Sequence, residues 1–76
     1  MEIDKFINDF ADLFEDTDVT LFSEKTSFKD VLEWDSLLLL STIAMIDEKY
    51  GISIKGSDLE KLVTILDLFQ FIKKRI

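Results

Sequence analysis

Residues 33–51 read EWDSLLLLSTIAMIDEKYG, and this stretch decides the fold because it contains both ends of the longest helix that the sequence predicts. Asp35 and Ser36 are residue types that cap helix N-termini, and Gly51 is the type that most often ends a helix. We therefore predict a central helix from Asp35 to Tyr50. Its apolar residues fall on two faces, which predicts two packing neighbours; one face has Leu38 and Met45, and the other has Leu40, Ile43, Ile46 and Tyr50.

Three further helices are predicted around this one. A first helix over residues 2–15 has apolar side chains at steps of three and four, which is typical of a helix buried on one side. Two capping boxes, beginning at Ser57 and Thr64, open a short third helix and a last helix. The apolar side of the first helix comprises Ile3, Phe6, Ile7, Phe10, Leu13 and Phe14, and that of the last comprises Ile65, Leu68, Phe69, Ile72 and Ile76.

The segment between the first two helices, residues 15–34, has no regular hydrophobic period. It is longer than the ~12 to 15 residues above which structureless loops are uncommon, so we expect a helical turn inside it, opened by a capping box at Ser27. The predicted fold class is all-α, with three long helices, a short third helix and a long structured loop. A chain of this length forms a single domain over residues 1–76.

The composition excludes most catalytic chemistry. There is no Cys and no His, which excludes disulfides, thiolate ligands, Ser-His triads and nearly all zinc sites. Asp16, Asp18 and Glu24 resemble the ligands of a calcium loop, but Leu21 and Ser27 stand where that loop needs Gly and Glu. We therefore predict no catalytic residue, no metal site and no enzymatic activity of the chain by itself.

The formal charge of −7 makes some partners unfavourable, because an acidic chain repels nucleic acid and anionic lipid surfaces. Residues 1–35 hold 11 acidic and 3 basic residues, so the acidity belongs to the first helix and the loop. No apolar run approaches the ~18 residues of a membrane span, and the first residues do not resemble a leader. We expect no nucleic-acid partner, no membrane insertion and a cytoplasmic location.

The junction between the loop and the central helix is the candidate site. A hydroxyl at Ser36 lies beside unpaired backbone N–H groups and the positive end of the helix dipole, so an anion attached there is favoured. The alternative is that Asp35 or Ser36 is only a helix cap.

Asp35-Ser36-Leu37 at the head of this helix resembles the attachment motif of acyl carrier proteins, and Trp34 resembles the aromatic residue found there in many discrete carriers. Residues 46–54 are similar to the family's acidic helix end, followed by an aromatic residue, Gly and an Ile-x-Ile extension. Residues 64–72 resemble its last helix. The resemblance spans essentially the whole chain and implies a monomeric four-helix bundle of the acyl-carrier type.

The resemblance also implies a function. A phosphopantetheinyl transferase would move 4'-phosphopantetheine from coenzyme A to the Ser36 hydroxyl, with Asp35 helping to orient the transferase's magnesium and Leu37 contacting partner enzymes. The thiol of this arm would carry acyl groups as thioesters between the acyl-loading and acyl-processing enzymes of a fatty-acid, polyketide or related pathway. An imported thiol explains a carrier without Cys.

The sequence departs from the family after the motif. Fatty-acid carriers usually have acidic residues where this chain has Leu38 and Ser41, so we expect a specialised pathway rather than bulk fatty-acid synthesis. Leu38, Leu39 and Met45 either form an apolar docking surface or pack under the long loop. The candidate partner-binding residues are Leu37, Leu38, Ser41, Met45, Asp47 and Glu48.

Two alternatives remain open at the level of sequence. The chain is an aminoacyl or peptidyl carrier, since the loading enzyme chooses the cargo, or it is an unmodified acidic helical module that binds a partner helix. The Phe-rich first helix and loop either line or fill a cavity for an acyl chain. The basic residues 73–75 either dock a partner or stabilise the end of the last helix.

Overall fold

Helix α2 (Ser36–Tyr50) begins and ends where the sequence predicts. The structure is a computed structural model that describes residues 2–76. Gly51 ends α2 in the left-handed conformation, with φ of 68°, and its N–H donates to the Asp47 carbonyl. Helix α2 contacts both α1 (Ile3–Ala11) and α3 (Gly56–Glu60), which confirms the two neighbours predicted from its two apolar faces.

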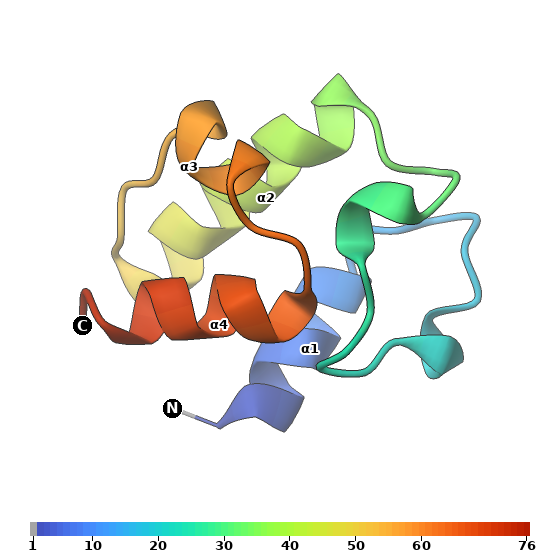
Figure 1. Cartoon of the computed structure of the whole chain (residues 1–76), viewed down its shortest axis with the longest axis horizontal. Helices are drawn as coiled ribbons and strands as arrows, with labels where there is room; N and C mark the ends of the chain where they lie inside the picture. Colours follow the sequence, from blue (N-terminus) through green and yellow to red (C-terminus); the bar gives the residue numbers. More distant parts are fainter. Residues whose placement is uncertain (1) are drawn as a thin grey trace.

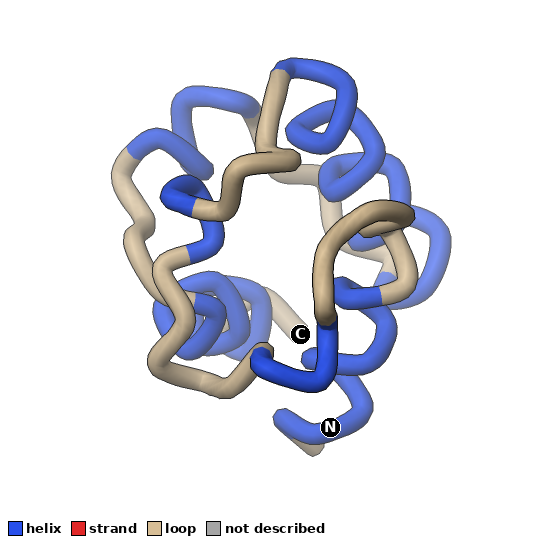
Figure 2. The backbone as a smooth tube through the Cα atoms, turned by 90° about the vertical axis from the view of Figure 1, so that its right-hand side faces the viewer, coloured by secondary structure: helices blue, strands red, loops and turns tan. Residues whose placement is uncertain are grey.

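The described residues form four α-helices, so the all-α prediction is confirmed. Helix α4 (Ile65–Lys73) lies beside α1, and α3 lies beside α2 (Figure 1). The loop between α1 and α2 contains two 3₁₀ turns, η1 (Val19–Leu21) and η2 (Phe28–Asp30). Figure 2 shows helices and loop segments alternating around a common centre. Within residues 2–76, no helix is both long enough and apolar enough to cross a membrane.

Helix α1 is shorter than predicted. The helix ends at Ala11, and the last α-helical hydrogen bond runs from the Asp12 N–H to the Asn8 carbonyl. Leu13 and Phe14 donate instead to carbonyls three residues earlier, those of Phe10 and Ala11. This tighter turn directs the Phe14 ring toward Phe22 of the loop, and the two ring centroids lie 5.1 Å apart. Phe14 is therefore buried although it lies beyond the end of α1. The hydrophobic period therefore located the buried side chains correctly but overestimated the length of the helix.

Two of the predicted capping boxes are wrong. The turn at Phe28 exists, but the Ser27 side chain does not cap it, and the Ser27 backbone instead pairs with Thr64 in an isolated antiparallel bridge. Helix α3 begins one residue before Ser57, and the Asp58 carboxylate accepts a hydrogen bond of 3.0 Å from the Lys55 N–H. The cap of α3 is therefore formed by Asp58 from within the helix.

The predicted cap of α4 is confirmed. The Thr64 hydroxyl accepts from the Asp67 N–H, and the Asp67 carboxylate accepts from the Thr64 N–H, both at 3.1 Å. Helix α4 ends at Lys73, so the prediction that Ile76 lies on its buried side is wrong, and Ile76 is exposed. The buried residues of α4 are Ile65, Leu68, Phe69 and Ile72.

The aromatic residues of α1 and the loop fill the interior. Phe6, Phe10 and Phe28 have no exposed surface. Phe10 has ring centroids 5.7 Å from Phe28 and 6.4 Å from Phe6, which are ordinary packing distances for aromatic pairs. These three side chains fill the interior, whereas Phe22 of the loop lines a pocket beside Ile7 of α1.

The loop is held against the far end of the chain by its backbone. The Ile65 and Leu66 N–H groups donate to the carbonyls of Thr26 and Glu24, and the Lys29 ammonium donates to the Glu60 carbonyl. These bonds pair polar groups that α4 and α3 leave free at their ends. The long loop is therefore a fixed part of the bundle.

Candidate functional site

Asp35 caps α2 and leaves the Ser36 hydroxyl free of that role. The Asp35 backbone is extended, its Oδ1 accepts from the Leu38 N–H at 2.9 Å, and its carbonyl accepts from the Leu39 N–H at 3.0 Å. Ser36 is the first residue of the helix and its side chain is exposed. The choice between Asp35 and Ser36 as the cap is thus resolved in favour of Asp35.

Trp34 anchors the residue before the cap to the core. Its ring centroid lies 5.2 Å from that of Phe28, 6.3 Å from that of Phe10 and 6.4 Å from that of Phe14. The Trp34 N–H donates to the Val31 carbonyl at 2.9 Å. The half-buried indole therefore fixes the position from which α2 starts.

Glu33 ties the junction before α2 to the loop that follows α1, a role that the sequence did not predict. Its carboxylate accepts from the N–H groups of Glu15 and Asp16 at 2.9 and 3.0 Å and from the Thr17 hydroxyl at 2.6 Å. The Thr17 hydroxyl and the backbone N–H groups stabilise the charged form, so the pKa of Glu33 lies below its ordinary value. Nothing in the local pattern indicates this contact, because the partners lie 16 to 18 residues earlier.

The buried face of α2 differs from the docking surface considered above. Leu38 and Met45 are 7% and 5% exposed, so the hypothesis that they form an apolar docking surface or bind a partner helix is wrong. They belong to the hydrophobic core, which is the alternative considered for Leu38. Thr42 lies between them, fully buried, and its hydroxyl donates to the Leu38 carbonyl at 2.8 Å.

The face of α2 that remains open begins next to Ser36. Leu37 and Leu40 are 70% and 61% exposed, which contradicts the placement of Leu40 on a buried face with Ile43, Ile46 and Tyr50. Positions 37, 40 and 44 share one side of the helix, and their apolar residues gave no signal that this side is exposed. Of the remaining candidate contacts, Ser41 is half-buried, and Asp47 and Glu48 are exposed. Ala44, which was not a candidate, is also exposed.

A family model described as a phosphopantetheine attachment site matches residues 4–72 of the chain. The chain belongs to the acyl carrier protein family. Members of this family carry covalently attached 4'-phosphopantetheine and are carriers rather than catalysts. The exposed hydroxyl at the N-terminal end of α2 fits this group, because the positive end of a helix dipole favours the negative phosphodiester.

Three curated relatives, each called acyl carrier protein, resemble this carrier over most of its length. The protein of an Exiguobacterium species is 34% identical over 59 residues, which covers 78% of this chain and 75% of the relative. The Chlamydia felis protein is 38% identical over 58 residues, or 76% of this chain and 74% of the relative. The Desulforapulum autotrophicum protein is 31% identical over 65 residues, or 86% and 84% of the two chains.

Proposed function

We propose that Ser36 is the residue of this carrier that receives 4'-phosphopantetheine. The observation that carries the proposal is the exposed Ser36 hydroxyl on the first residue of α2, immediately after the residue that caps the helix. Intact-protein mass spectrometry after incubation with coenzyme A, magnesium and a broad-specificity phosphopantetheinyl transferase tests it. A gain of one phosphopantetheine is expected; no gain with several transferases, from a folded chain, favours the unmodified interaction module.

Ser36 and Asp35 have different roles in this transfer. The Ser36 oxygen attacks the phosphorus that carries the pantetheine arm of coenzyme A, so the new P–O ester bond forms as the pyrophosphate bond breaks. Adenosine 3',5'-bisphosphate leaves, and the hydroxyl proton passes to a base that the transferase supplies. The Asp35 carboxylate uses Oδ1 for the helix cap, so its second oxygen is the one to contact the transferase's magnesium. Once attached, the arm supplies the thiol that carries acyl groups as thioesters.

The exposed face of α2 is the proposed contact with the transferase and the acyl-processing enzymes. It is apolar at Leu37, Leu40 and Ala44, and acidic at Asp47 and Glu48. A partner that fits it has an apolar pocket near the carrier's serine and basic side chains about three helical turns further along α2, opposite Asp47 and Glu48.

A matched pair of variants tests this face. Leu40→Glu is expected to slow loading by the transferase, because it places a charge among the apolar contacts. Leu21→Glu changes an equally exposed leucine in the loop, far along the chain from α2, and is expected to leave loading unchanged. Equal rates for both variants would contradict the assignment of the face.

We further propose a specialised acyl pathway rather than bulk fatty-acid synthesis. At the two positions where fatty-acid carriers usually have acidic residues, this chain has Leu38, which is buried, and Ser41, and exposed charges are screened beyond about 8 Å at physiological salt. The malonyl-loading enzyme of fatty-acid synthesis is therefore expected to load this carrier slowly. The same enzyme is expected to load the Ser41→Glu variant faster than the wild type. Loading as fast as that of the host's fatty-acid carrier would refute the proposal. An aminoacyl group on carrier purified from its host would favour the peptidyl alternative.

A further inference from the structure

Glu33 is the side chain near Ser36 that the attachment motif leaves unexplained. It lies three residues before the serine, and its carboxylate accepts hydrogen bonds from the N–H groups of Glu15 and Asp16 and from the hydroxyl of Thr17. In Figure 1 the segment after α1 and the segment before α2 run side by side at this point. We call these three hydrogen bonds the Glu33 clamp.

We propose that Glu33 is a positioning residue for phosphopantetheinyl transfer: the Glu33 clamp fixes the segment that leads into α2 and thereby presents Ser36 to the transferase. This inference rests on the proposed function of Ser36. Glu33 touches neither the hydroxyl nor the transferred group, and it acts through the backbone that precedes the serine.

Three consecutive residues before Ser36 are each held by a different part of the molecule. Glu33 binds the loop after α1, Trp34 packs on the rings of Phe10, Phe14 and Phe28, and Asp35 caps α2. Trp34 is held by apolar packing and Asp35 by the helix itself. The Glu33 clamp is therefore the contact that ties the junction to the polar loop at residues 15–17.

A junction that is already ordered in the free carrier does not have to be ordered when the transferase binds. Loss of the clamp is therefore expected to raise the KM for the carrier and to leave kcat nearly unchanged, because Ser36 and Asp35 are intact in the bound state. A general loss of stability lowers the amount of folded carrier instead, and unfolding measurements detect it separately.

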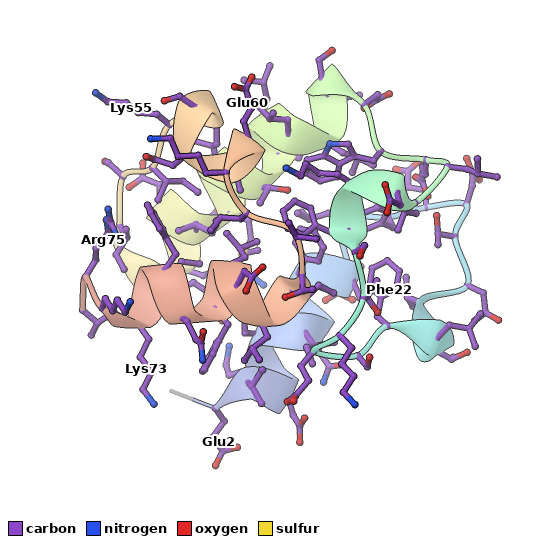
Figure 3. All side chains as sticks on the ribbon, in the orientation of Figure 1. Glu2, Phe22, Lys55, Glu60, Lys73 and Arg75 are labelled. Carbon is purple, nitrogen blue, oxygen red and sulfur yellow. The ribbon has the colours of Figure 1, made fainter. Side chains whose placement is uncertain are left out.

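The clamp can be observed without any transferase. In NMR spectra of the unmodified carrier, the amide protons of Glu15 and Asp16 are expected to shift together as pH falls, with an apparent pKa below 4.5, the ordinary value for a glutamate. Glu33→Gln removes that titration and offers an amide NH₂ where the carboxylate accepted hydrogen bonds. Glu60→Gln, an exposed glutamate at the end of α3 (Figure 3), is the charge-matched control.

Transferase kinetics on the same proteins test the positioning role. Glu33→Gln is expected to lower kcat/KM by about 3- to 10-fold through KM, less than the ~100-fold that a 1 Å misplacement of a reacting group can cost. Glu60→Gln is expected to match the wild type. Thr17→Val is expected to reproduce part of the loss, Thr17→Ser to restore it, and the loss in Thr17→Val/Glu33→Gln to be no larger than in Glu33→Gln alone.

Two results overturn the inference. If the wild type is loaded and a folded Glu33→Gln variant without the amide titration has an unchanged KM, the clamp has no positioning role, and the function proposed for Ser36 stands. If the wild type is not loaded at all, the function proposed for Ser36 fails and the inference fails with it.

Discussion

The Tyr50 hydroxyl donates a 2.6 Å hydrogen bond to the Asp9 carboxylate and joins the C-terminal end of α2 to α1. Asp9 is 8% exposed, although the sequence places it among the polar residues of its helix. Lys5 and Lys49 lie 3.0 and 3.2 Å from the same carboxylate. A buried carboxylate with three donors stabilises the contact between two helices, and each donor can be removed separately.

Tyr50→Phe is expected to lower the free energy of unfolding by about 1.5 to 3 kcal/mol, the usual range for a hydrogen bond to a charged group. The ring remains packed on Phe6, 5.8 Å away, so the loss reports the hydroxyl. Urea unfolding measures it. Lys5→Ala is the comparison: it removes an i,i+4 pair whose lysine is exposed, and it should cost less than about 0.5 kcal/mol. A Tyr50→Phe value no larger than that would show that the buried bond adds nothing.

Acid should weaken the fold through Asp9. The Tyr50 hydroxyl, followed by the two lysines, lowers the pKa of Asp9 from 3.8 to about 2 against the opposing effect of burial. The folded-state pKa is depressed, so this stabilisation is complete above pH 3.8 and is lost as pH falls towards 2. Unfolding experiments between these pH values should show a smaller pH dependence in Asp9→Asn than in the wild type. Parallel curves for the two proteins would assign the acid sensitivity to other carboxylates.

The cap at Asp35 separates the stability of α2 from the chemistry of Ser36. Asp35→Ala is expected to cost about 0.5 to 2 kcal/mol because it removes the bond to the Leu38 N–H. Ser36→Ala changes an exposed hydroxyl and should stay within about 0.5 kcal/mol of the wild type. Thermal unfolding, monitored by circular dichroism, compares the stabilities of the two variants. Greater destabilisation by Ser36→Ala would return the capping role to the serine.

Gly51 is required for its backbone conformation rather than for space. Its φ of 68° suits glycine, and a Cβ built there meets nothing within 4 Å. Gly51→Ala is therefore expected to cost about 1 to 2 kcal/mol of unfolding free energy, and Gly51→Asn less, because asparagine tolerates this region better. Gly56→Ala is the matched control, with only an ordinary contact of 3.6 Å to Leu39. Similar losses for the alanine variants at both glycines would refute the backbone argument.

The features that the sequence predicted best are those specified by neighbouring residues. The ends of α2 at Asp35 and Gly51 and the cap formed by Thr64 and Asp67 each depend on residues within one helical turn. Local patterns also predicted a turn at Phe28, but they named the wrong cap, because Ser27 pairs with a segment 37 residues further along the chain.

The features that the sequence missed depend on how the chain closes on itself. The Glu33 clamp has no local signal, since its partners lie 16 to 18 residues away. The burial of Asp9 depends on Tyr50, 41 residues away, and its local pairing with Lys5 does not indicate it. The choice between Leu38 and Leu40 as the surface residue required the position of the loop, because four consecutive leucines cover every side of a helix. The sequence indicated Ser36 together with Asp35 and Trp34 beside it, but it did not indicate the hydrogen bonds of Glu33.

The most direct test of the account is to locate the modification. The carrier is incubated with coenzyme A and transferase, digested, and its peptides are sequenced by tandem mass spectrometry. Phosphopantetheine is expected on Ser36 and on no other serine, and Ser36→Ala is expected to stay unmodified. An unmodified Ser36 beside a loaded Ser23, Ser27, Ser41, Ser53 or Ser57 would contradict it.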